Sequence, residues 1–328
     1  MFTGKSFLPV TLFAALLLWA APYLFPIMEP LPPAEDYSPL SVLVLQFVSA
    51  GWQRPLVFIL SLLMLLLLNQ IDDRFSLIRE RSSAVGSFFL LAASLFTFVQ
   101  CDVVAVFVTF LFAAAVYSLF AAYNHELPSK PVFTAFFYIG MASLLFPRAL
   151  CFLPLFFFGM WQAKVLTPKN FHASLLGCLL PYWFLAAYSV LVGRWDLLLA
   201  LYHNVFAGWL QNYSTITVAQ WAAQFTLLFV SVPALFYLMR YYYLDKMQVR
   251  RQLTFLLFFE LCAVAMALLL PCCFNIGLLL QLIGCSFLTI HYALFSKSRL
   301  VPFLFFFSLL LFILIYLFPL WKNLFVFV

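Results

Sequence analysis

Apolar runs of about 20 residues recur along the whole sequence, separated by short polar stretches. Wound as an α-helix with a rise of about 1.5 Å per residue, such a run crosses a hydrocarbon core of about 30 Å. A segment that crosses alone has to satisfy its own backbone hydrogen bonds, and a helix does so. Of the 328 residues 66% are hydrophobic and only 9% are charged, too few to cover a soluble protein. The predicted fold class is therefore all-α, a polytopic transmembrane helix bundle.

Eleven segments fit this description, so the sequence predicts about eleven spans. They are approximately residues 6–27, 55–71, 84–99, 103–122, 132–146, 149–162, 173–192, 217–239, 253–270, 276–294 and 301–320. The three shortest of them reach only about 21–24 Å as helices. Residues 132–162, broken at Pro147 and Arg148, are also compatible with a re-entrant hairpin. The predicted number of crossings is therefore about nine to eleven.

The Lys and Arg residues predict a cytoplasmic N-terminus. With that orientation 13 of the 17 basic residues lie in cytoplasmic loops and four lie outside, in agreement with the positive-inside rule. The net charge of +6 does not indicate nucleic-acid binding, because the basic residues form no groove or binding motif. We expect an integral protein of a bacterial inner membrane, with membrane lipid as its immediate partner.

The stretches between the spans are too short for a soluble domain, so residues 1–328 are expected to form a single transmembrane domain. The first apolar run exceeds the core of about 7–15 residues found in cleaved signals, and we interpret it as a retained helix. Two apolar stretches in outer loops, residues 40–52 and 195–210, are interpreted as helices that lie along the membrane interface.

Acidic residues on the predicted outer side are the first candidates for a site. Glu35 and Asp36 lie in the first outer loop, and Asp102 lies in the very short second outer turn. Carboxyl groups gathered at one rim are able to act as a general base pair or to bind a divalent cation. The alternative is that the loop residues are solvated and that Asp102 only ends a helix.

Two further outer residues have phosphate-binding chemistry. Arg148 lies between two short segments, against the charge trend of the other loops, and its guanidinium group is suited to a phosphate. His203 lies in the outer 195–210 stretch and is a second candidate. Alternatively, Arg148 reaches lipid head groups and His203 is an ordinary interfacial ring.

The stretch from Phe137 to Arg148, FYIGMASLLFPR, consists of small and apolar residues followed by a basic one. It resembles a run found in GT-C type glycosyltransferases, which are multi-span enzymes that use sugars linked to polyprenyl phosphate. The resemblance covers about residues 1–170 and leaves 171–328 as additional spans. Members of that family are usually longer and often carry a soluble outer domain. The chain also resembles, more loosely, bacterial polytopic inner-membrane proteins of similar length.

In the GT-C family an acidic residue of the first outer loop precedes interfacial helices, and a second acidic residue lies in the second outer turn. Glu35 or Asp36 and then Asp102 fall in the corresponding places. The resemblance implies that Asp36 or Glu35 deprotonates an acceptor while Arg148 holds the donor phosphate. Asp102 would orient the acceptor or share a divalent cation. The sugar, the acceptor and the need for a metal are not defined by the sequence.

Glu260 lies within the predicted span 253–270, and an acidic residue inside a span indicates a functional group by default. His291 and Gln281 on the next span are possible partners. The alternative is a protonated side chain bonded to a neighbouring helix. The acidic residues predicted to be inside are interpreted as solvated loop charges: Asp72, Asp73, Glu80, Glu126 and Asp245.

Three functions follow from these patterns. The leading prediction is a membrane glycosyltransferase that takes sugar from a lipid-phosphate donor on the outer face. The second is a proton-coupled transporter or flippase that uses Glu260 and His291. The third is a non-enzymatic assembly partner of another membrane protein.

Overall fold

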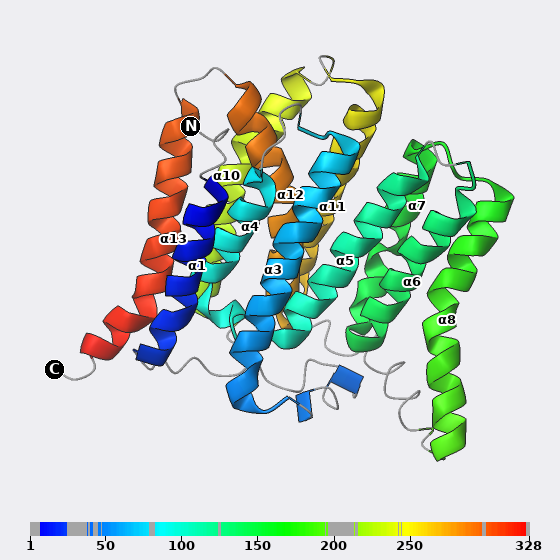
Figure 1. Cartoon of the computed structure of the whole chain (residues 1–328), viewed down its shortest axis with the longest axis horizontal. Coiled ribbons are helices and arrows are strands. Elements are labelled where there is room, and N and C mark those ends of the chain that lie inside the picture. Colours follow the sequence, from blue (N-terminus) through cyan, green and yellow to red (C-terminus); the bar gives the residue numbers. More distant parts are fainter. Residues whose placement is uncertain are drawn as a thin grey trace. The chain divides into compact units, whose positions relative to one another are not determined.

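The computed structural model describes residues 7–24, 38, 40–41, 45–46, 48–78, 83–123, 126–193, 195, 213, 216–241, 243, 245–296 and 300–325. Over these residues the chain is helical, with short 3-10 turns and no strand (Figure 1). Six of the helices are long and apolar enough to cross a membrane. The all-helical class is confirmed, and six such helices indicate a polytopic membrane protein. The number of crossings and their orientation stay predictions.

Each of the eleven predicted segments coincides with a helix. The α-helices are α1 Phe7–Leu24, α3 Ala50–Phe75, α4 Ala84–Leu95, α5 Val103–Ala122, α6 Ser129–Leu145, α7 Leu153–Gln162, α8 Pro168–Val192, α10 Val218–Tyr241, α11 Met247–Leu269, α12 Phe274–Phe295 and α13 Leu300–Phe325. Helix α11 begins at Met247, ahead of the predicted 253, because its polar first turns contain Gln and Arg, which are good helix formers. Similarly, α3 begins ahead of Pro55.

Side-chain caps and special backbone angles define the limits of the helices. Thr167 caps α8 by accepting a hydrogen bond from the Asn170 N–H, and Pro168 follows at the first helical position. The same helix ends at Gly193, whose φ of 71° is in the left-handed region that glycine adopts without strain. The predicted break between 132–146 and 149–162 is the 3-10 helix η3, Pro147–Phe152, between α6 and α7.

The chain divides into two compact units. Unit 1 comprises residues 1–32, 53–106 and 212–328, and unit 2 comprises 33–52 and 107–211. Both units are discontinuous in sequence, and the division at Val106 lies within α5. Of the two stretches predicted to lie along the interface, 195–210 is described only at Trp195. Of 40–52, residues 40–41, 45–46 and 48–52 are described, and 50–52 belong to the start of α3. The interfacial placement of both stretches stays a prediction.

In unit 2, α6 and α8 pack closely through small residues (Figure 1). A Cβ atom at Gly140 would lie 2.6 Å from the Cys178 carbonyl oxygen. A Cβ atom at Gly177 would lie 2.4 Å from the Phe133 carbonyl oxygen. Glycine at both positions therefore lets the two backbones approach each other, as small residues do in membrane helix pairs. The Tyr182 hydroxyl donates a hydrogen bond of 2.7 Å to Ser143 Oγ across the same contact.

In unit 1, α12 is the most enclosed helix. Within its membrane-length segment Pro271–Phe295, 94% of the most apolar 18-residue stretch is buried. It packs against α10, α11 and α4, and α10, α11 and α12 are neighbours in Figure 1. Helix α1 packs against α4, where Trp19 Nε1 donates to Ser94 Oγ over 2.9 Å. A helix enclosed in this way faces protein on most sides, and it is the place where buried polar groups are found.

Candidate functional site

Of the outer residues singled out in the sequence, Glu35, Asp36 and His203 lie outside the described residues. Asp102 and Arg148 are described, and they belong to different units. The proposed grouping of these five residues therefore stays a prediction.

Asp102 is buried, with 2% of its surface exposed. Its Oδ1 accepts a hydrogen bond of 2.9 Å from the Ala105 N–H in the first turn of α5. Its Oδ2 accepts one of 3.2 Å from Asn275 Nδ2, from the first turn of α12. Asp102 therefore caps α5, which agrees with the alternative that it ends a helix, and it also joins the ends of two helices.

Arg148 lies in η3 of unit 2 and is buried, with 6% exposed. Four residues before it, the Leu144 carbonyl oxygen accepts a hydrogen bond of 2.7 Å from Ser38 Oγ. Ser38 follows Asp36 by two residues. The segment just after the first-loop carboxylates is thus attached to the end of α6, next to the turn that carries Arg148.

Polar side chains, most of them buried, extend from Asp102 along α10, α11 and α12; we call these the α10–α12 polar row. Its members are Asp102, Thr217, Gln220, Asn275, Gln224, Gln281, Ser231, Glu260, Gln252, His291 and Asp245. Thr217, at the Asp102 end, is exposed. At the Asp102 end, Asn275 Oδ1 accepts a hydrogen bond of 2.7 Å from Gln220 Nε2. Gln220 Oε1 in turn accepts hydrogen bonds from the Thr217 N–H and hydroxyl at 2.8 and 2.9 Å. The polar groups at this end are bonded to one another.

The next members of the row are Gln224 and Gln281, one to two turns further along α10 and α12. Gln224 Nε2 donates to Gln281 Oε1 over 2.7 Å, and both residues are fully buried. Gln224 Oε1 and Gln281 Nε2 have no hydrogen-bond partner among the described residues. Two buried amides that share only one hydrogen bond are unusual in an apolar core. Each buried donor or acceptor left without a hydrogen bond costs about 1–3 kcal/mol.

Glu260 lies near the middle of α11 and is buried, with 1% exposed. It faces Gly284, the residue at the middle of α12, where a Cβ atom would lie 2.8 Å from the Glu260 Cβ. The Ser231 side chain on α10 interacts with the carboxyl group. Neither carboxyl oxygen has a hydrogen-bond partner of normal geometry among the described residues. Three helices thus meet around one acidic side chain inside an apolar bundle.

At the opposite end of the row, His291 Nε2 lies 3.3 Å from Asp245 Oδ2, and their side chains are 5% and 9% exposed. Asp245 is therefore largely buried and is not the solvated loop charge that the sequence predicted. The prediction was wrong because α12 brings His291 to the turn before α11. Gln252 on α11 is also buried, at 4% exposed, and its Oε1 and Nε2 have no hydrogen-bond partner in the described part of the chain.

The row runs most of the length of the helices. From Asn275 to His291 along α12 the rise is about 24 Å, close to the thickness of a hydrocarbon core. The sequence analysis identified Glu260, Gln281 and His291 as possible partners, but the structure pairs Gln281 with Gln224 and His291 with Asp245. Gln220, Gln224 and Gln252 were missed. Their signal was present as glutamines inside otherwise apolar segments.

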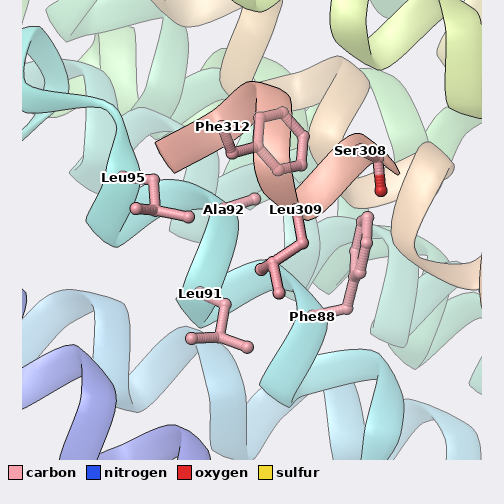
Figure 2. Close-up of a pocket in the computed structure, with 7 residues that line it drawn as sticks. All are labelled: Phe88, Leu91, Ala92, Leu95, Ser308, Leu309 and Phe312. Atoms are coloured by element: carbon pink, nitrogen blue, oxygen red, sulfur yellow. The ribbon is translucent and has the colours of Figure 1, made fainter. Parts of the chain in front are cut away.

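Two other kinds of site have less support. A pocket between α4 and α13 is lined by Phe88, Leu91, Ala92, Leu95, Ser308, Leu309 and Phe312 (Figure 2). Its volume of about 10 Å³ is enough for about one water molecule and too small for a substrate. The described residues contain no group of three or more His, Cys, Asp or Glu side chains suited to a metal ion. Glu35 and Asp36, the predicted ligands of a divalent cation, lie outside those residues.

The chain was compared with known proteins. No protein-family model matches the sequence, and no curated protein or solved structure matches it. The assignment of a function therefore rests on the site itself.

Proposed function

We propose that the protein is a proton-coupled membrane transporter, with Glu260 as the group that takes up and releases the proton. The observation that carries this proposal is the position of Glu260. It is a buried carboxyl group at the middle of a membrane-length helix, without a hydrogen-bond partner of normal geometry among the described residues. An acidic side chain is expensive in such a place and is retained in membrane proteins mainly for function.

The surroundings of Glu260 support proton binding over a purely structural role. Asp102, which joins two helices, accepts a hydrogen bond of normal geometry from Asn275. The carboxyl group of Glu260 interacts with the Ser231 side chain, but no hydrogen bond of normal geometry reaches either of its oxygens from the described residues. Glu260 instead lies in a row of polar groups that leads toward both ends of α12. In an apolar interior the neutral form of a carboxyl group is favoured, and a nearby polar route allows the proton to leave.

Vesicles test this function without knowledge of the transported solute. Purified protein is reconstituted into liposomes that contain a pH-sensitive dye, and a potassium diffusion potential drives protons inward. Wild-type vesicles are expected to acidify faster than empty vesicles, and Glu260→Gln is expected to return the rate to that of empty vesicles. Glu126→Gln is the matched control, because Glu126 is exposed in the turn between α5 and α6. The flux measured without solute is the uncoupled proton leak of the transporter, and a leak above that of empty vesicles that stays unchanged in Glu260→Gln contradicts the proposal.

A glycosyltransferase of the GT-C kind is the second candidate. The hydrogen bond from Ser38 Oγ to the Leu144 carbonyl favours it, because it attaches the chain that follows Glu35 and Asp36 to the turn carrying Arg148. A carboxylate base and a guanidinium for the donor phosphate would then lie near one another. Incubation with a radiolabelled polyprenyl-phosphate sugar tests this reading. Release or transfer of the sugar, lost in Asp36→Asn and Arg148→Lys, supports it, and no release by the wild type rejects it.

A further inference from the structure

The two ends of the α10–α12 polar row differ in how their groups are bonded. At the Asp102 end, Thr217, Gln220, Asn275 and Asp102 form a direct chain of hydrogen bonds. At the Asp245 end, both polar atoms of Gln252 are buried and have no hydrogen-bond partner among the described residues. Buried polar atoms without a protein partner are usually bonded to water. The Asp245 end therefore favours ordered water, whereas the four bonded residues at the Asp102 end do not require it. The Gln224–Gln281 pair between that end and Glu260 also has unpartnered atoms, but its two amides bond directly to each other.

Helix register places Gln252 and His291 at one level, between Glu260 and the Asp245 end. Helices α11 and α12 are antiparallel neighbours, with Ala267 opposite Gly277 and Glu260 opposite Gly284. The same register, continued by seven residues on each helix, sets His291 beside Leu253, the neighbour of Gln252. Glu260 lies about 10–12 Å from this level along the helix axes. That distance suits a short water chain and is too long for a direct proton transfer.

The chemistry of the Asp245 end suits proton exchange. Imidazole is the side chain that gains and loses protons most readily near neutral pH. The other groups that face His291 are the Asp245 carboxyl group at 3.3 Å, the Tyr237 ring at 6.4 Å on α10 and the Phe295 ring at 4.7 Å on α12. Two basic residues, Arg250 and Arg251, directly precede Gln252 on the first turns of α11. The Asp245 carboxyl group lies within 3.3 Å of the imidazole nitrogen that would carry the proton.

We propose that Asp245 and His291 form the entry site where a proton from solvent binds before it reaches Glu260. Gln252 orders the water that connects His291 with Glu260. A proton from solvent binds the imidazole nitrogen, passes to water held by Gln252 and then to the Glu260 carboxylate, which forms an O–H bond. Release runs through the same steps in reverse, and only N–H and O–H bonds change. In this conformation Glu260 exchanges protons with the Asp245 end. The inference rests on the proposed function of Glu260.

Rapid-mixing infrared spectroscopy on the full-length protein in detergent tests the route. After a pH jump, the C=O stretch of a protonated carboxyl group that disappears in Glu260→Gln reports the protonation of Glu260. We expect His291→Gln and Gln252→Met to slow the rise of this band about tenfold or more, with an unchanged final amplitude. His172→Gln, at an exposed histidine on α8, is the matched control and is expected to keep the wild-type rate.

The outcomes separate the two proposals. A band that rises equally fast in wild type, His291→Gln and Gln252→Met overturns the route but leaves Glu260 as a proton-binding group. If no band depends on Glu260, the proposed function fails and the route fails with it. A slow rise in Gln224→Leu, with wild-type rates in His291→Gln, overturns the assigned direction. Asp245→Asn, which preserves the side-chain shape, provides the same test if His291→Gln does not fold.

Discussion

Gly284 on α12 faces Glu260 on α11 so closely that a Cβ atom at position 284 would lie 2.8 Å from the Glu260 Cβ. The Leu256 carbonyl oxygen, one turn earlier on α11, would lie 3.2 Å from the Cβ atom added at position 284. The acidic side chain therefore occupies a place that exists only because its neighbour has no side chain. The close approach of α11 and α12 and the burial of the Glu260 carboxyl group therefore both depend on glycine at position 284.

The first prediction concerns this contact. Gly284→Ala is expected to lower the free energy of unfolding by about 1–3 kcal/mol, because α11 and α12 have to move apart. Gly51→Ala on α3 is the control, since nothing lies within 4 Å of a Cβ atom there. Thermal unfolding in detergent measures both. Equal stability of the two variants would show that α11 and α12 do not pack as described.

The second prediction concerns the Gln224–Gln281 pair. Gln224→Leu or Gln281→Leu alone leaves a fully buried amide without its partner and is expected to cost about 1–3 kcal/mol. The double variant replaces both amides with apolar groups of similar size and is expected to be more stable than either single variant. A complete cycle of unfolding measurements gives the coupling energy. Additive losses would show that the two amides do not interact.

The third prediction separates the two hydrogen bonds of Asp102. Asp102→Ala removes the cap on α5 and the bond from Asn275, and it is expected to cost about 1–2 kcal/mol. Asp102→Asn retains an oxygen that is able to accept from the Ala105 N–H, so a smaller loss is expected. Unfolding midpoints rank the variants. The same loss in both would assign the effect to the Asn275 bond alone.

The fourth prediction concerns the α6–α8 contact of unit 2. Gly140→Ala and Gly177→Ala each place a methyl group against a backbone carbonyl oxygen that is unable to move independently of its helix. Each substitution is expected to lower the free energy of unfolding by about 1–3 kcal/mol. The double variant is expected to lose less than the sum, because separation of the helices relieves both clashes at once. Strictly additive losses would indicate that the two clashes are relieved separately.

Glutamines within apolar segments show what sequence pattern alone misses. The pattern located every α-helix longer than one turn in the described part of the chain, because the need to satisfy backbone hydrogen bonds in lipid acts on each segment separately. It did not identify Gln220, Gln224 and Gln252 as parts of one row, because their alignment depends on the register between helices. Asp245 was interpreted as a solvated charge for the same reason. Its partner His291 lies 46 residues further along the chain.

The helical membrane class, the positions of the helices and the unusual placement of Glu260 inside one of them were all predictable from the amino-acid sequence. These are properties of single segments, set by hydrophobicity, length and local caps. Only the tertiary structure decided that Asp102 bonds to Asn275, that Gln224 bonds to Gln281 and that Gly284 makes room for Glu260. Such contacts depend on how close two helices approach and at which register. Small residues at the interface set both, and no single segment contains that information.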